Sequence, residues 1–556
     1  MITFIHTYAE TVFPALVSSG LWREGDGLKL MHKPGFLPPY DFNSVAAPGG
    51  ALETLLRDLR CPFYIDRLQG GLGRTALYPY DRALTRHTET LLGERFLGFQ
   101  MHEWASNLRS DEKRIRALAE KEGVAAGDAA AWARLWDRVE TGALPLFLEA
   151  YTAAEWRNRP LFTGLSSFLE ETRKLYEKRA KNTPGKLIPA DSYFMAHRTE
   201  LANGARLLLP EAGWQIPNLR AQLAFTRGMA KAANVPWGIY YECWQNTEGY
   251  GYTIPYALRD GQDEWREDLK TKANGAALPF EKREHGGSSL SLMARAWRLA
   301  YFSGAKYLGE EYGVCNTFRD LKEGTLSPYG ETKREFLRFT EAFPDPGNPF
   351  APIAVVLPKT MEMLDITFGD RWLEYPFSDP ACPLTETQMR AFRETMAAVF
   401  GHTGANGNMG HVIKCGGLPG VCDIVYEDTP ALKEYDYLID LTFDGAFAKA
   451  HNNVVPPEKA DALLDELLPC RAGGGLFAAY NRTPFGWLVL IINNDGIRHD
   501  HFSPDEKIKE AAVHTALAVK PGLTVQKAAG DGELKKDGEN YTLALDAGDW
   551  TLLTLG

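Results

Sequence analysis

The chain has 556 residues, of which 45% are hydrophobic and 24% are charged, and its formal net charge at pH 7 is −11. This composition is typical of a soluble globular enzyme and excludes a disordered or fibrous chain, while the length predicts more than one domain. The acidic balance and the lack of a clustered basic stripe argue against a nucleic-acid partner, and no apolar run reaches the roughly 18 residues of a membrane span.

The cysteines and the first residues predict a reducing compartment. The seven cysteines are scattered and odd in number, which fits free thiols better than a disulfide framework. Cys415 and Cys422 lack a second CxxC pair, so no zinc site and no cofactor are expected. The start, residues 1–6, has neither a basic segment nor a long apolar one, so we expect a cytoplasmic location, or a periplasmic one if a leader has been trimmed.

Residues 1 to about 345 alternate short apolar runs with helical patterns, which is typical of βα units. The predicted strands are 2–6, 28–32, 62–66, 95–103, 191–197, 206–211, 236–242 and 305–310, and the clearest helices are 51–60, 218–233 and 288–303. Eight such strands predict a (β/α)₈ TIM barrel of 1–345, with insertions at 105–185 and 245–287 near its mouth. If 28–32 is not a strand, every later strand moves one place down in the barrel.

Two further regions follow a linker rich in proline and glycine at 343–349. Residues 350–472 predict strands at 353–357, 423–426 and 437–441 and helices at 385–400 and 457–468, which indicates a small α/β domain of flavodoxin or amidotransferase type. From 473 to 556 the pattern alternates between apolar and polar residues, with turn pairs such as Asp495-Gly496 and Asp537-Gly538. This pattern predicts a C-terminal antiparallel β domain.

One strand end stands out. The apolar run from Arg95 to Met101 changes abruptly to His102, Glu103 and Trp104, and chemistry in a parallel barrel sits at that end of the strands. Glycoside hydrolysis needs two carboxyl groups that face one glycosidic bond. Glu103 ends the fourth predicted strand and Glu242 the seventh, so the two can approach each other across the mouth. Glu211, which follows an apolar run and precedes Gly213 and Trp214, is a rival for the second carboxylate.

Other polar and aromatic residues at the predicted strand ends suit a sugar site, where planar hydrogen-bonding groups and ring platforms surround hydroxyls. The candidate substrate-binding residues are His102, Trp104, Asn107, Asp66, Arg67, His197, Trp214, Trp244 and Glu310. A metal-dependent hydrolase built on His6, His32 and His197 with Asp66 is an alternative, although the first strand lacks an H-x-H pair. The sequence has no G-x-S-x-G turn for a serine hydrolase.

The layout resembles the clan A glycoside hydrolases, and in particular the family 42 β-galactosidases. The residues that carry the resemblance are the runs 304–310, 326–330, 352–357 and 546–553. The resemblance implies an acid/base on the fourth strand and a nucleophile on the seventh, which are Glu103 and Glu242. Two features depart from the family, which makes the chain a divergent relative: His102 precedes Glu103 where the clan usually has Asn, and the four-Cys zinc cluster of some members has no match.

These observations predict a retaining β-glycosidase without a cofactor that acts on an oligo- or polysaccharide, with no nucleic-acid or membrane partner. The alternative is a carbohydrate-binding or scaffold protein on a degenerate barrel, because a fold does not establish an activity. In the resembling family the domain that corresponds to 350–472 mediates a trimer, so we expect a homo-oligomer, either a trimer or a dimer.

Overall fold

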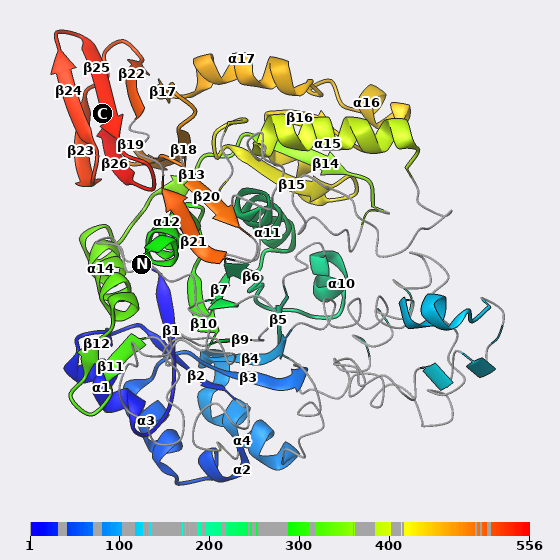
Figure 1. Ribbon diagram of the computed structural model, residues 1–556, viewed down its shortest axis with the longest axis vertical. Coiled ribbons are helices and arrows are strands. Elements are labelled where there is room, and N and C mark those ends of the chain that lie inside the picture. Colours follow the sequence, from blue (N-terminus) through cyan, green and yellow to red (C-terminus); the bar gives the residue numbers. More distant parts are fainter. Residues whose placement is uncertain are drawn as a thin grey trace.

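The computed structural model describes a barrel followed by two further sheet regions (Figure 1). The described residues are 2–31, 42–70, 81–102, 117–125, 186–191, 196–213, 218–242, 245–246, 252–253, 287–311, 317–359, 384–401, 416–494, 497–500, 503–508 and 513–556, with single positions between them. Most of both predicted insertions, 105–185 and 245–287, lies outside these residues.

Eight parallel strands form the barrel wall, and barrel strands that follow one another along the chain are paired in the sheet, except β5 and β6, which stand at its two ends. They are β1 Thr3–Thr7, β2 Gly27–Met31, β3 Phe63–Gly70, β4 Phe96–His102, β5 Leu187–Ala190, β6 Glu211–Gly213, β7 Gly238–Glu242 and β10 Tyr307–Glu311. β10 is the eighth barrel strand and pairs with both β1 and β7. A parallel bridge between Leu187 and Ala205 joins the chain before β6 to β5, so the barrel is nearly closed.

The predicted second strand is confirmed, because β2 pairs with both β1 and β3. The predicted fifth strand, 191–197, is wrong: the strand is β5, and His197 begins helix α10, His197–Ala202. Both segments are short and apolar, and periodicity cannot separate a buried strand from the start of a buried helix. The predicted sixth strand, 206–211, lies too early in the chain, since β6 spans Glu211–Gly213 and shares only Glu211 with the prediction.

The barrel interior is filled by side chains that alternate along each strand. A buried cluster inside the wall takes Ile5, Tyr64, Ile188 and Tyr240 from the first, third, fifth and seventh strands. Residues at the alternate positions point outward. On β2 and β3 these are Leu28, Leu30, Phe63 and Ile65, which pack against helices of the first half of the barrel. This alternation fixes which strand-end residues face the mouth.

The outer helices follow from amphipathic patterns with clear end signals. They are α1 Val12–Ser18, α2 Phe42–Val45, α3 Ala51–Leu59, α4 Arg82–Leu92, α10, α11 Leu219–Ala233, α12 Gly287–Phe302 and α14 Pro328–Ala342. Helix α3 ends at Arg60, which adopts a left-handed conformation with φ of 51°. In α14, Pro328 occupies the first turn, and the Ser327 hydroxyl accepts a hydrogen bond from the Gly330 amide.

A three-stranded parallel sheet follows the barrel, in the order β15-β14-β16. Its strands are β14 Ile353–Leu357, β15 Cys422–Tyr426 and β16 Tyr437–Asp440, and its helices are α15 Glu386–Phe400, α16 Gly445–Ala450 and α17 Pro457–Leu467. The predicted strands and helices of this region are confirmed. The sheet packs on barrel helix α11, and Gly228 allows the contact because a Cβ there would lie 2.3 Å from the Ile424 carbonyl oxygen.

The C-terminal region is antiparallel, as predicted. A five-stranded sheet has the order β13-β18-β19-β26-β23, and a four-stranded sheet has the order β17-β22-β25-β24. The strands are β13 Asn348–Pro349, β17 Cys470–Ala472, β18 Phe477–Thr483, β19 Gly486–Ile492, β22 Val513–Val519, β23 Val525–Gly530, β24 Glu533–Asp537, β25 Asn540–Leu545 and β26 Trp550–Leu555. Three hairpins complete the set: β8 Gln245–Asn246 with β9 Tyr252–Thr253, β11 Phe318–Asp320 with β12 Thr325–Leu326, and β20 Ile497–Asp500 with β21 Ser503–Ile508.

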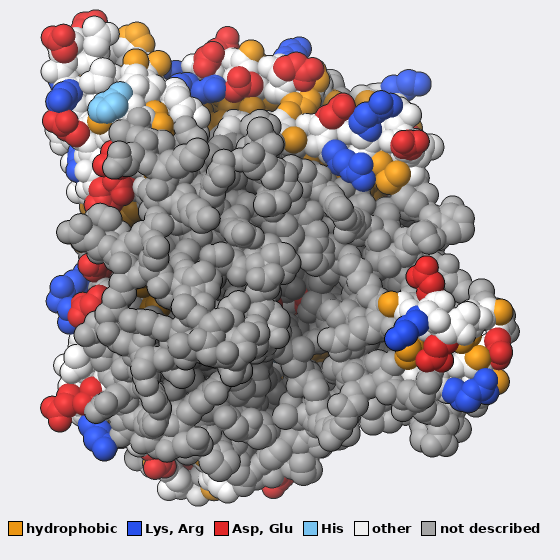
Figure 2. Space-filling model, viewed as in Figure 1, with side chains coloured by type: hydrophobic (Ala, Val, Ile, Leu, Met, Phe, Trp, Pro, Cys, Tyr) orange, Lys and Arg blue, Asp and Glu red, His pale blue; other side chains and the backbone are white. Residues whose placement is uncertain are grey.

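One buried apolar cluster runs from the outer side of the barrel into both later sheet regions. On the face drawn in Figure 2, acidic and basic side chains are interspersed over the described C-terminal strands and the upper helices. Among the described residues, no helix combines the length and the apolar character needed to cross a bilayer. Three cysteines that the structure describes, Cys61, Cys422 and Cys470, are buried free thiols.

Candidate active site

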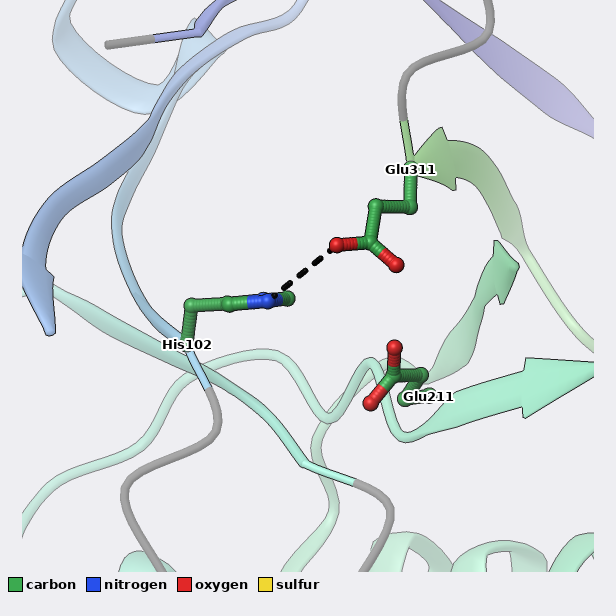
Figure 3. A group of neighbouring side chains, drawn as sticks. All are labelled: His102, Glu211 and Glu311. Atoms are coloured by element: carbon green, nitrogen blue, oxygen red, sulfur yellow. Dashed lines mark ion pairs between the residues drawn. The ribbon is translucent and has the colours of Figure 1, made fainter. Parts of the chain in front are cut away.

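Three titratable side chains converge inside the C-terminal end of the barrel: His102, Glu211 and Glu311 (Figure 3). One nitrogen or oxygen atom of each lies within 4.8 Å of the others. His102 Nε2 and Glu311 Oε1 are 3.4 Å apart. All three are buried, with exposed fractions of 0%, 3% and 2%. The cluster therefore concentrates two carboxyl groups and one imidazole in a place shielded from bulk water.

Strand geometry explains why these three meet. They come from β4, β6 and β10, which are the fourth, sixth and eighth strands of the barrel. Side chains inside such a barrel form layers to which every second strand contributes. Glu211 and Glu311 sit two and four residues after the inward-facing Leu209 and Tyr307, and His102 pairs in register with the inward-facing Ala190. The cluster is thus one layer of the barrel interior.

The charges of this layer oppose one another. One oxygen of each carboxylate lies within 4.8 Å of the other, and two charges at this separation repel by roughly 3–4 kcal/mol at an effective dielectric constant near 20. A proton, a bound cation or a neighbouring cationic side chain offsets such repulsion. Buried carboxyl groups placed in this way are suited to proton transfer or to cation binding, because either event relieves the repulsion.

Below this layer lies a buried charge network. Lys29 Nζ is 2.5 Å from Asp66 Oδ2, 3.2 Å from the Tyr240 hydroxyl and 2.6 Å from the Glu310 carbonyl oxygen. The Tyr240 hydroxyl donates to the same carboxylate oxygen at 2.8 Å. The Tyr240 ring meets the His102 ring edge to face, with centroids 5.6 Å apart. The network therefore supports the imidazole of the cluster from beneath.

Two inner-wall polar groups have no hydrogen-bond partner in the described part of the chain. Both amide atoms of Gln100, which is completely buried, and the hydroxyl of Thr7 are in this position. Gln100 pairs in register with inward-facing Ile188, and Thr7 lies two residues after inward-facing Ile5. Buried polar groups normally have a hydrogen-bond partner. Gln100 and Thr7 are therefore suited to bind water or another polar ligand inside the barrel.

The described part of the chain brings together only some of the predicted site residues. His102 and Glu211 lie in the cluster, and Asp66 lies just beneath it in an ion pair with Lys29. Glu103, Trp104, Asn107, Trp214 and Trp244 lie outside the described residues, and Glu242 and Arg67 are described in their strands without their side chains. The backbone of Glu242 pairs in register with Glu311 and with Gly213.

Two predicted substrate-binding residues lie away from the mouth. His197 is buried between α10 and α11: its Nδ1 is 2.7 Å from Glu200 Oε2, its Nε2 is 3.0 Å from Thr226 Oγ1, and its ring stacks on Phe225. Its prediction depended on a fifth strand that is in fact a helix start. Glu310 points away from the barrel interior and pairs with Lys333 of α14, because in β10 the inward positions are Gly309 and Glu311.

The metal set suggested by the sequence does not assemble. His6 faces outward, 3.4 Å from Asp26 Oδ2, and burial lowers the pKa of this imidazole despite that carboxylate. Burial alone would raise the pKa of Asp26, but hydrogen bonds and charges from His6 and Arg23 lower it. His197 lies between two helices and Asp66 pairs with Lys29, so these residues do not point toward one common centre. His32 lies outside the described residues.

Sequence reasoning missed Lys29 and Tyr240, and it placed Glu310 rather than Glu311 among the candidate substrate-binding residues. Lys29 lies between the outward-facing residues Leu28 and Leu30, so strand alternation could have identified it as inward-facing. The same alternation applied from Tyr307 selects Glu311. Alternation divides each strand into two faces, but the sequence does not show which of the two faces points into the barrel.

No family model matches the chain, and no curated protein matches its sequence. Among solved structures, the fold is similar to a polyextremophilic β-galactosidase from the Antarctic haloarchaeon Halorubrum lacusprofundi, with a TM-score of 0.38 and 10% identity over 100% of this chain and 99% of that one. A native debranching enzyme from Nostoc punctiforme matches with a TM-score of 0.25 and 8% identity, over 100% of this chain and 98% of that one. Both scores are too low to carry an argument about function.

Proposed function

We propose that the chain is a glycoside hydrolase that cleaves a β-glycosidic bond with retention, at the C-terminal mouth of its barrel. The observation that carries the proposal is the buried layer of His102, Glu211 and Glu311. Glu103 follows His102 directly in the chain, and Glu242 pairs in register with Glu311. β4 and β7, the strands that Glu103 follows and Glu242 ends, are the fourth and seventh strands of one barrel.

The assignment of roles follows the resemblance to clan A. Glu103 is the acid/base on the fourth strand and Glu242 is the nucleophile on the seventh, with Glu211 as the rival for the second carboxylate. In a retaining mechanism the nucleophile attacks the anomeric carbon while the acid protonates the leaving oxygen, and water then releases the sugar with the same residue acting as base. A pair about 5–5.5 Å apart suits this path, whereas an inverting pair needs ~6.5–9.5 Å.

The described residues supply the surroundings that this chemistry needs. Glu211 and Glu311 add two buried carboxylates to the inner wall at the mouth of the barrel. The Lys29 network holds the strands beneath the mouth, since Lys29 Nζ joins the side chain of β3 to the backbone of β10. These contacts support precise placement of carboxylates on rigid strands rather than on loops.

The test is a set of variants assayed on a panel of aryl β-glycosides, with product anomers followed by NMR. Glu103→Gln and Glu242→Gln should each lower kcat by at least about 10³-fold. Azide added to a Glu242→Ala variant should restore turnover as a glycosyl azide of inverted configuration. Wild-type product should first form as the β-anomer.

The matched control is Glu200→Gln, which removes a buried carboxylate that pairs with an imidazole outside the barrel mouth. It should keep wild-type kcat. Wild-type turnover in both Glu103→Gln and Glu242→Gln would refute the assignment, and sugar binding without any product across the panel would favour a non-catalytic carbohydrate-binding protein.

We also infer a homo-oligomer that uses the region 350–472. The sheet of this region packs on its own barrel through α11, where Arg227 Nε lies 2.6 Å from Asp423 Oδ1. Its outer helices α16 and α17 lie on the side away from the barrel (Figure 1) and are available to a second copy. Light scattering at micromolar concentration should report more than one 61.9 kDa chain per particle, and a monomer with full activity would overturn this inference.

A further inference from the structure

The layer of His102, Glu211 and Glu311 has the composition of a metal site. Each residue offers one ligand atom, and these atoms lie within 4.8 Å of one another. Ligand atoms bound to one cation at about 2.0–2.2 Å lie at most about 4.4 Å from each other, so small side-chain shifts would let all three atoms contact the same cation. Figure 3 shows the three side chains pointing toward a common centre from three strands.

The charge of the layer also favours a cation. Two carboxylates and one imidazole carry two negative charges when the imidazole is neutral, and all three side chains are buried. A divalent cation neutralises both charges at once and uses the lone pairs of all three groups.

A second observation comes from Gln100, which precedes His102 by two residues in β4 and therefore shares its inward face. In the described part of the chain, neither atom of its buried amide has a hydrogen-bond partner. The Thr7 hydroxyl, also on the inner wall, is in the same position. A hydrated cation provides what these groups lack, because water bound to a metal both donates and accepts hydrogen bonds.

We propose that His102, Glu211 and Glu311 bind a divalent cation of the Mn²⁺ or Zn²⁺ type. One imidazole and two carboxylates form a mixed nitrogen and oxygen set, which favours these ions over Ca²⁺ and Mg²⁺, whose sites are built of oxygen. Three protein ligands leave open positions for water or for a substrate oxygen. With Glu211 bound to the cation, Glu103 and Glu242 remain as the two carboxylates for hydrolysis. Cation binding itself does not depend on that activity.

The experiment measures binding of Mn²⁺ to the full chain after treatment with a chelator, without any sugar. Titration followed by electron paramagnetic resonance should show one tight site per chain. Glu311→Gln, Glu211→Gln and His102→Gln should each weaken binding by at least tenfold. Glu200→Gln, which alters a buried imidazole–carboxylate pair outside the mouth, should bind as the wild type does.

A measurement on the wild type keeps the test decisive if the variants fold poorly. The electron spin echo of bound Mn²⁺ should be modulated by one imidazole nitrogen, and Mn²⁺ should raise the melting temperature. Absence of a tight site, absence of the nitrogen signal, or wild-type affinity in folded Glu311→Gln and Glu211→Gln would overturn the proposal. Binding without glycosidase activity would support the cation site and refute the hydrolase, whereas activity unchanged by the chelator in a chain that binds no metal would do the reverse.

Discussion

Two buried imidazole–carboxylate groups in this chain differ in what surrounds them. Between α10 and α11, His197 has one partner on each ring nitrogen, Glu200 and Thr226, and stacks on Phe225. Inside the barrel mouth, His102 meets Glu311 at the longer distance of 3.4 Å, and a second carboxylate, Glu211, joins them.

From this difference we expect a structural role for the outer group and a chemical role for the inner one. The outer group is fixed by short contacts with side chains of both helices. These contacts stabilise the packing of α10 against α11. The inner group places two carboxylates and one imidazole together at the mouth of a barrel, an arrangement that is common where a proton or a ligand is bound. Burial and residue type are the same in both places, so neither alone identifies a functional site.

The largest expected effect comes from replacing one carboxylate in each of the two groups. Glu211→Gln should lower kcat/KM on an aryl β-glycoside by about 10³-fold, because it removes a mouth carboxylate, and it should leave the melting temperature unchanged or raise it. Glu200→Gln should do the opposite, with kcat/KM unchanged and stability reduced by about 1–3 kcal/mol. Steady-state kinetics and thermal unfolding of both variants measure this. Equal behaviour of the two would refute the distinction.

Lys29→Met tests the network beneath the mouth. It leaves the Asp66 carboxylate buried without its cation, and breaking a buried pair in this way costs about 3–5 kcal/mol. Urea unfolding measures the loss. The double variant Lys29→Met, Asp66→Leu should recover most of the lost stability, because neither charge of this pair remains buried. If the double variant is as unstable as the single one, packing rather than charge explains the loss.

Gly228→Ala tests the contact between the barrel and the parallel sheet. The added Cβ would lie 2.3 Å from the Ile424 carbonyl oxygen, so α11 must shift, and we expect a loss of about 1–3 kcal/mol. Gly445→Ala in α16 is the matched control, since nothing lies within 4 Å of its Cβ, and it should not destabilise the chain. Thermal unfolding compares the two. A neutral Gly228→Ala would mean that this interface is not tightly packed.

The smallest expected effect concerns an ion pair on the outer helices. Hydrogen bonds from His87 and then Arg57 lower the pKa of Glu53 to about 2. A carboxyl group with a lowered pKa contributes stability above its ordinary value of 4.5, and this contribution is lost as the pH falls toward 2. Glu53→Gln should therefore destabilise the chain by about 1 kcal/mol at pH 7, after allowance for solvent screening, and by nothing near pH 2. Urea unfolding at both pH values measures this, and a difference that persists at low pH would contradict it.

Much of the architecture could be predicted from the sequence alone. Apolar runs such as Ile353–Leu357 and Trp487–Ile492 bury themselves wherever they pair, so their strands follow from local composition. The last barrel helix was equally readable, because Ser327 and Pro328 form its start by local hydrogen bonding and fixed φ. These features depend on neighbours in the chain and need no knowledge of the fold.

The site depended on tertiary structure. Which of Glu310 and Glu311 faces the mouth is decided by the register of β10 between β1 and β7, and a shift of one residue would exchange their roles. His197 was misplaced because an apolar run does not reveal whether its buried surface faces a strand or a helix. Lys29 reads as a surface residue in the sequence, and only the closed barrel brings Asp66, Tyr240 and the Glu310 carbonyl around it. Local composition determined the elements, whereas the inward face of each strand, and with it the candidate site, was decided by closure of the barrel.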